Sequence, residues 1–246
     1  AGKGEKAIKT LAKVGGPEYA SETETEIKET LANDTARVDY SELKIPKVRR
    51  IILIGVVFAV LQQWCGINTV FNYADEIFTA AGYGVSDMLM NVVLVGSVNF
   101  LFTIVAMQLI DRLGRRFLML LGYGGLAVIF ALFGGFYMLG LTGVIMLISV
   151  MVATALYAMT LAPTTWVVLS EIFPNRVRGV AMSIATFGLW SACFILTYSF
   201  PSLNKGLGAS GTFWLYGGVC LLGFLFIKRY LIETKGKTLE EIENEI

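Results

Sequence analysis

Three amide side chains lie close together inside a long apolar run of this sequence. Gln62, Gln63 and Asn68 fall within residues 51–73, which are otherwise mostly apolar. A buried amide without a hydrogen-bond partner costs roughly 2–7 kcal/mol in an apolar medium. We therefore expect these side chains to face a polar cavity or a neighbouring helix rather than lipid. A cavity lined by uncharged hydrogen-bonding groups suits a neutral polyol such as a sugar.

A glycine between these amides offers a way to bring them together. On an ideal helix, Gln62 and Gln63 point about 100° apart and Asn68 points about 140° beyond Gln63. A break near Gly66, where glycine tolerates unwound backbone, lets all three converge on one ligand. The alternative is that the amides bond between helices and hold a bundle together.

Two further polar side chains are candidates for the same site. Asn99 is a lone amide in the next apolar run, and it is open to the same two interpretations. Trp166 offers a flat apolar face and one N–H donor, although a packing role is also open. It follows Pro163, which removes a backbone donor and disturbs the helical turn back to Met159.

The composition is typical of an integral membrane protein. The chain is 55% hydrophobic and 16% charged, whereas soluble domains carry about 25% charged residues. Because the sequence has no histidine, a histidine-based metal site or proton relay is excluded within it. Three cysteines in apolar runs lack metal-ligand spacing and are expected to be packing residues with free thiols: Cys65, Cys193 and Cys220. We expect that the protein binds no metal, cofactor or nucleic acid and that it is not an enzyme.

Six apolar runs approach the ~20 residues needed to cross a bilayer. They lie at about 51–73, 88–110, 117–139, 143–169, 179–200 and 211–232. Residues 1–48 have the charge density and spacing of short amphipathic helices, and 239–242 is expected to lie in another. We therefore predict an all-α integral membrane protein with a polar helical segment (1–48), a six-helix domain (49–232) and a polar tail (233–246).

The cationic residues predict the orientation in the membrane. All but Lys205 of the 20 Lys and Arg residues fall on one side of the six expected spans. By the positive-inside rule both ends of the chain are cytoplasmic, in a plasma or inner membrane. The spans also divide into two groups of three, and the interruptions at Gly66 and Pro163 each fall in the first span of a group. Matching interruptions predict a transporter binding site at the interface of a 3+3 inverted repeat.

Opposite charges gather in two of the expected cytoplasmic connections. The candidates are Asp111, Arg112, Arg115 and Arg116 in the first connection, and Glu171 and Arg178 in the second. Pairs between the connections could hold one conformation of a two-state carrier. The alternative is a solvated anchoring face, whose exposed pairs contribute little.

Together these patterns resemble the sugar porter family of the major facilitator superfamily. The four motifs that carry the resemblance are QQWCGIN at 62–68, DRLGRR at 111–116, SEIFPNRVRG at 170–179 and ETKGKTLEE at 233–241. The resemblance implies the C-terminal half of a twelve-helix fold, with residues 1–48 as the linker between the halves. The chain begins at Ala1 without methionine, and we expect a fragment or processed product that lacks helices one to six.

The resemblance also assigns roles to residues. Sugar contacts fall on Gln62, Gln63, Asn68, Asn99 and Trp166, and the cytoplasmic charge network falls on Asp111, Arg112, Arg115, Arg116, Glu171 and Arg178. Three positions depart from the family pattern. Leu189 stands where relatives often have a sugar-contacting amide, Asn72 where many have a gate tyrosine, and Ala162 replaces the usual glycine before Pro163.

The implied function is transport of a monosaccharide by alternating access. The implied partners are the sugar, the lipid bilayer, and either the missing N-terminal half or a second copy of the chain. Two alternatives stay open: a membrane sugar sensor that does not transport, and a self-associating half. The acids within 51–232 are Asp75, Glu76, Asp87, Asp111 and Glu171. All lie near expected helix ends, so the chain shows no mid-membrane carboxylate that would indicate an ion pathway.

Overall fold

The computed structural model describes residues 4–33, 42–74, 77, 79, 85–141 and 143–237. The expected helix at 239–242 and the acids Asp75 and Glu76 lie outside these residues. The chain divides into two compact units, Ala1–Leu43 and Lys44–Ile246. The first unit contains α1 (Gly4–Asn33), which is interrupted by a non-helical Gly16 directly before Pro17.

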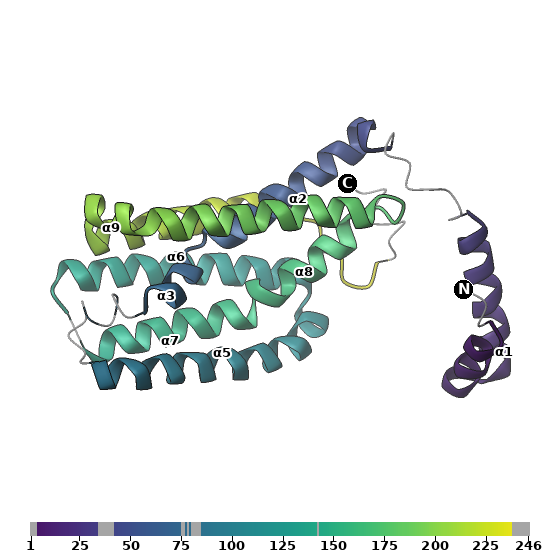
Figure 1. Cartoon of the computed structure of the whole chain (residues 1–246), viewed down its shortest axis with the longest axis horizontal. Coiled ribbons are helices and arrows are strands. Elements are labelled where there is room, and N and C mark those ends of the chain that lie inside the picture. Colours follow the sequence, from purple (N-terminus) through teal and green to yellow (C-terminus); the bar gives the residue numbers. More distant parts are fainter. Residues whose placement is uncertain are drawn as a thin grey trace. The chain divides into compact units, whose positions relative to one another are not determined.

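The second unit is a bundle of helices (Figure 1). A 3-10 turn at Glu42–Lys44 lies at the boundary of the two units. The described helices of the second unit are α2 (Pro46–Trp64), α3 (Ile67–Asn72), α5 (Val85–Leu113), α6 (Arg115–Met138), α7 (Val144–Met159), α8 (Leu161–Ile172) and α9 (Arg178–Tyr230). Pro46 suits the start of α2, because the N–H that proline lacks has no partner within the first turn of a helix.

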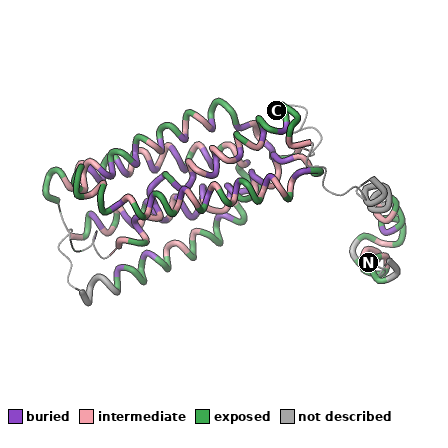
Figure 2. The backbone as a smooth tube through the Cα atoms, turned by 45° about the horizontal axis from the view of Figure 1, so that its top comes forward, coloured by how far each residue is buried: buried purple, intermediate pink, exposed green. Residues whose placement is uncertain are grey.

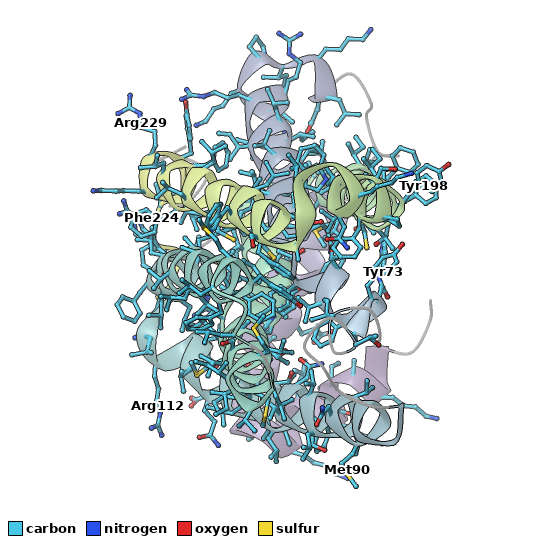
Figure 3. The ribbon with its side chains drawn as sticks, turned by 90° about the vertical axis from the view of Figure 1, so that its left-hand side faces the viewer. Tyr73, Met90, Arg112, Tyr198, Phe224 and Arg229 are labelled. Carbon is cyan, nitrogen blue, oxygen red and sulfur yellow. The ribbon has the colours of Figure 1, made fainter. Side chains whose placement is uncertain are left out.

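The 53-residue α9 consists of two arms, 178–207 and 209–230, separated by a non-helical Gly208 (φ 70°, ψ 171°). The Trp64 indole donates to the Ala192 carbonyl of the first arm, while the Cys220 thiol of the second arm donates to the Cys65 carbonyl. On a straight helix Ala192 and Cys220 would lie about 42 Å apart. Since they contact adjacent residues of one segment, the arms are antiparallel neighbours. Figure 3 shows them side by side, with Tyr198 on one and Phe224 on the other.

Five helical segments among the described residues are long and apolar enough to cross a membrane. They are Pro46–Asn72, Met90–Leu113, Arg115–Met138, Val144–Ile172 and Arg178–Tyr230. The first four match the first four expected spans, and the two arms of α9 hold most of the remaining two. The all-helical class predicted from the sequence is therefore confirmed for the described residues, and their helices are long and apolar enough for several membrane spans.

The apolar core lies between α2, α6, α7 and α9, and buried positions follow the inward faces of these helices (Figure 2). Aromatic rings join α6 to the second arm of α9. Phe133 and Phe213 meet edge to face at 4.4 Å, and Phe213 stacks on Tyr137 at 5.8 Å. By contrast, most residues of α5 from Met90 to Leu113 are exposed or half-buried, so α5 lies at the edge of the unit.

Candidate functional site

The break between α2 and α3 positions the predicted amides. Gly66 adopts φ 90° and ψ −8°, a left-handed conformation that favours glycine. A Cβ at this position would also lie 2.5 Å from the Tyr216 ring. The break turns α3 so that the Asn68 amide donates a hydrogen bond to Gln63 Oε1. Asn68 Nδ2 also lies 3.8 Å from the sulfur of Cys193 on α9.

Gln62 faces α7 and is almost completely buried, with 3% of the residue exposed. Its Nε2 donates to the Tyr157 hydroxyl at 2.6 Å, whereas no group among the described residues donates to its Oε1. α7 ends at Met159, and α8 begins after Thr160, whose φ and ψ are −121° and −80°. The segments α2–α3 and α7–α8, which are each interrupted, therefore meet through Gln62 and Tyr157, near the breaks at Gly66 and Thr160.

We call Gln62, Gln63 and Asn68 the amide cluster. The structure places two further residues beside it, Tyr157 and Cys193, which were not predicted as site residues from the sequence. Tyr157 gives no signal in a run of apolar residues. Cys193 was interpreted as a packing residue, but its half-buried thiol lies beside Asn68. Both contacts join residues about a hundred positions apart, a separation that sequence spacing cannot encode.

Asn99 and Trp166 are not joined to the amide cluster. Asn99 is half-buried on α5, and Trp166 on α8 is 40% exposed. Within the described part of the chain, neither side chain hydrogen-bonds to the cluster. Leu189 is buried and packs in the core.

Asn72, one of the positions that depart from the family pattern, lies at the end of α3 and contacts α9. The Asn72 amide lies 3.4 Å from the Thr197 hydroxyl, and the Tyr73 hydroxyl donates to the Thr197 carbonyl at 3.0 Å. The Tyr73 ring also packs on Phe200, with centroids 4.6 Å apart. These contacts fix the far end of α3 to the first arm of α9.

Charged residues gather at one end of the bundle, which we call the basic end and define by residues 111–116, 171–178 and 228–235. Arg115 pairs with Glu171 at 3.0 Å, and the two side chains are only 14% and 22% exposed. Arg115 also pairs with Asp111 at 3.3 Å, but Asp111 is 77% exposed, so this pair contributes little. The second carboxylate oxygen of Glu171 accepts a 2.6 Å bond from the Thr234 hydroxyl.

Glu233 is a further residue of the basic end that was not among the predicted site residues. Its two oxygens accept the backbone N–H groups of Arg115 at 2.9 Å and Arg116 at 3.1 Å. A carboxylate at this position satisfies donors in the first turn of α6 and suits the positive end of the helix dipole. The approach is close enough that a Cβ on Gly114 would lie 2.6 Å from Glu233. The signal for Glu233 was the motif at 233–241.

The guanidinium groups of Arg116 and Arg178 donate to backbone carbonyls, whereas Arg112 takes part through its own carbonyl. Arg116 donates to the Lys228 carbonyl at 2.9 Å, and Arg178 donates to the Phe173 carbonyl at 3.2 Å. The Arg112 carbonyl accepts a bond from the Lys235 ammonium at 2.7 Å. The described residues contain no cluster of three or more side chains suited to a metal ion.

Comparison with known proteins identifies the family. Residues 1–246 match the family model described as "Sugar (and other) transporter". The chain is 37% identical over 249 residues to the D-xylose-proton symporter of Escherichia coli (strain K12), covering 98% of this chain and 50% of that protein. It is 36% identical over 199 residues to the glucose facilitated diffusion protein of Zymomonas mobilis subsp. mobilis, covering 78% of this chain and 42% of that protein.

A solved structure gives the same result. The chain is similar to the proton:xylose symporter XylE, of the major facilitator superfamily, bound to 6-bromo-6-deoxy-D-glucose. The TM-score is 0.80 at 33% identity, over 99% of this chain and 52% of that chain. The chain thus spans about half the length of the relatives it matches. The chain belongs to the sugar porter family of the major facilitator superfamily.

Proposed function

We propose that this chain forms the C-terminal half of a monosaccharide carrier that works by alternating access. The observation that carries the proposal is the amide cluster, which gathers uncharged hydrogen-bonding groups at a helix break inside an apolar bundle. Such groups can donate hydrogen bonds to sugar hydroxyls and accept hydrogen bonds from them. Two relatives support the same class, since one is named a D-xylose-proton symporter and the other a glucose facilitated diffusion protein.

The carrier needs a second half, because the chain matches only about half of its relatives. In this proposal the two arms of α9 are separate spans, which makes six spans in two groups of three. The breaks at Gly66 and Thr160 then fall in the first span of each group. Asn99 and Trp166 lie outside the amide cluster. In this proposal they contact the sugar in the complete carrier, together with residues of the second half. That half is the N-terminal six-helix half or a second copy of this chain.

The basic end is cytoplasmic in this proposal, because cationic residues accumulate on that side of membrane proteins. The segment 1–48 is then the cytoplasmic linker between the halves, and 233–246 is a cytoplasmic tail at the plasma or inner membrane. The ion pair between Arg115 and Glu171 joins α6 to α8. The hydrogen bonds of Glu233 join the segment after α9 to the start of α6. Contacts made in only one conformation bias the carrier toward that conformation.

The test is uptake of labelled D-xylose, L-arabinose and D-glucose by the complete carrier in proteoliposomes, with and without a proton gradient. We expect saturable uptake of at least one sugar, and weaker uptake in the Gln63→Ala variant while the protein still elutes as a folded species. Saturable binding without uptake would identify a sensor instead. A folded carrier that neither binds nor takes up any monosaccharide would refute the proposal.

A further inference from the structure

The two glutamines of the amide cluster differ in which atoms the protein already uses. The carbonyl oxygen of Gln63 accepts a bond from Asn68. The carbonyl oxygen of Gln62 accepts none from the described residues, while its NH₂ group is bonded to the Tyr157 hydroxyl at 2.6 Å. The protein therefore uses the acceptor of Gln63 and one of the two N–H donors of Gln62.

Tyr157 and Gln62 are both buried, with 8% and 3% of each residue exposed, respectively. A glutamine amide offers two N–H donors and one carbonyl acceptor, and a tyrosine hydroxyl can accept and donate at once. Because the tyrosine oxygen holds Nε2, the carbonyl of Gln62 is turned away from the tyrosine. A buried acceptor without a donor is unfavourable, whereas the same acceptor meeting a hydroxyl is stabilised.

We infer that Tyr157 is a specificity-determining residue of the carrier, through its effect on Gln62. It fixes the Gln62 amide so that the oxygen, and not the NH₂ group, meets the sugar. At one position the carrier therefore requires a free hydroxyl that donates a hydrogen bond. The inference rests on the proposed function and adds the polarity of one sugar contact to it.

The inference predicts which sugar analogues are rejected. A deoxy sugar has no donor at the critical position, and a deoxyfluoro sugar carries fluorine, which can only accept. Both should bind about tenfold more weakly than the parent sugar, because Gln62 Oε1 is left without a donor. At positions that meet an N–H group, the fluoro analogue should be tolerated better than the deoxy analogue.

Removal of the tyrosine hydroxyl should change this pattern in one specific way. Tyr157→Phe keeps the ring but frees the Gln62 NH₂ group, so the amide can turn and present an N–H to fluorine. The matched control is Tyr123→Phe, because Tyr123 is also a buried tyrosine, on α6, and its hydroxyl has no partner among the described residues.

The experiment measures competition by monodeoxy and monodeoxyfluoro analogues of the best-transported sugar among D-xylose, L-arabinose and D-glucose. The complete carrier is compared with the Tyr157→Phe and Tyr123→Phe variants in proteoliposomes, after a check of folding by size exclusion and thermal unfolding. We expect one position at which both analogues are about tenfold weaker in the wild type and in Tyr123→Phe. In Tyr157→Phe the fluoro analogue at that position should recover to within about threefold of the parent sugar, while the deoxy analogue stays weak.

An unchanged analogue pattern in Tyr157→Phe would overturn the inference and leave sugar transport itself standing. If Tyr157→Phe does not fold, Gln62→Leu provides a second test, since loss of the acceptor should abolish the difference between the parent sugar and both analogues at that position. A persistent difference in Gln62→Leu would also overturn it. A wild-type carrier that takes up no sugar would instead refute the proposed function, and the inference with it.

Discussion

The substitution Gly66→Ala tests whether the helix break positions the amide cluster. A left-handed backbone costs a residue with a Cβ about 1–2 kcal/mol. The added methyl group would also lie 2.5 Å from the Tyr216 ring. Tyr216 cannot move aside easily, because it is 2% exposed, packs against Phe213 and bonds to the Thr69 hydroxyl at 3.3 Å.

Overpacking of this kind costs about 1–3 kcal/mol, which brings the expected loss for Gly66→Ala to about 2–5 kcal/mol. The control is Gly96→Ala on α5, where an added Cβ meets open space and the backbone is helical. There alanine should be neutral or stabilising by about 0.5–1 kcal/mol.

The assay is thermal unfolding of both variants of the complete carrier, followed by equilibrium sugar binding. Gly66→Ala should unfold at a clearly lower temperature and bind sugar more weakly, because Gln63 and Asn68 no longer meet. If Gly66→Ala matched Gly96→Ala in both measurements, the reasoning about the break would be refuted.

Three further predictions follow from the same structure. Gln63→Ala should weaken sugar binding by about 1–3 kcal/mol, measured by equilibrium binding, whereas unchanged affinity in a folded variant would make the amides a structural contact between helices. Glu171→Gln should speed amide hydrogen exchange at residues 111–116 much more than Asp111→Asn, because the Arg115–Glu171 pair is shielded from solvent and the Arg115–Asp111 pair is not. Equal effects of the two substitutions would contradict the stronger role given to Glu171. A cysteine at Asn175 should react with an impermeant thiol reagent only from the cytoplasmic side and one at Ser202 only from outside, and the reverse pattern would overturn the orientation.

Much of the fold could be predicted from the sequence, because a bilayer imposes a simple length rule on apolar runs. The expected spans fall on the apolar helices, and glycine and proline mark where the helices are interrupted. The sequence places the second interruption at Pro163, and α7 ends at Met159, the residue whose carbonyl proline cannot satisfy. The antiparallel arms of α9 are separated at Gly208, within the expected loop between two spans.

The contacts of the site could not be predicted in the same way. Tyr157 meets Gln62 across 95 positions, and Cys193 meets Asn68 across 125. Neither residue type stands out in an apolar run, so only the packing of α7 and α9 against α2 and α3 reveals them. Glu233 was visible as part of a motif, but its capping of α6 depends on where the end of α9 packs.

A structure of the complete carrier with bound sugar tests the central claim most directly. The account predicts sugar hydroxyls within hydrogen-bond distance of the amide cluster, with one hydroxyl donating to Gln62 Oε1 while Tyr157 still holds Nε2. A sugar bound elsewhere, with the Gln63–Asn68 and Gln62–Tyr157 pairs unchanged and no sugar contact to them, would contradict the account.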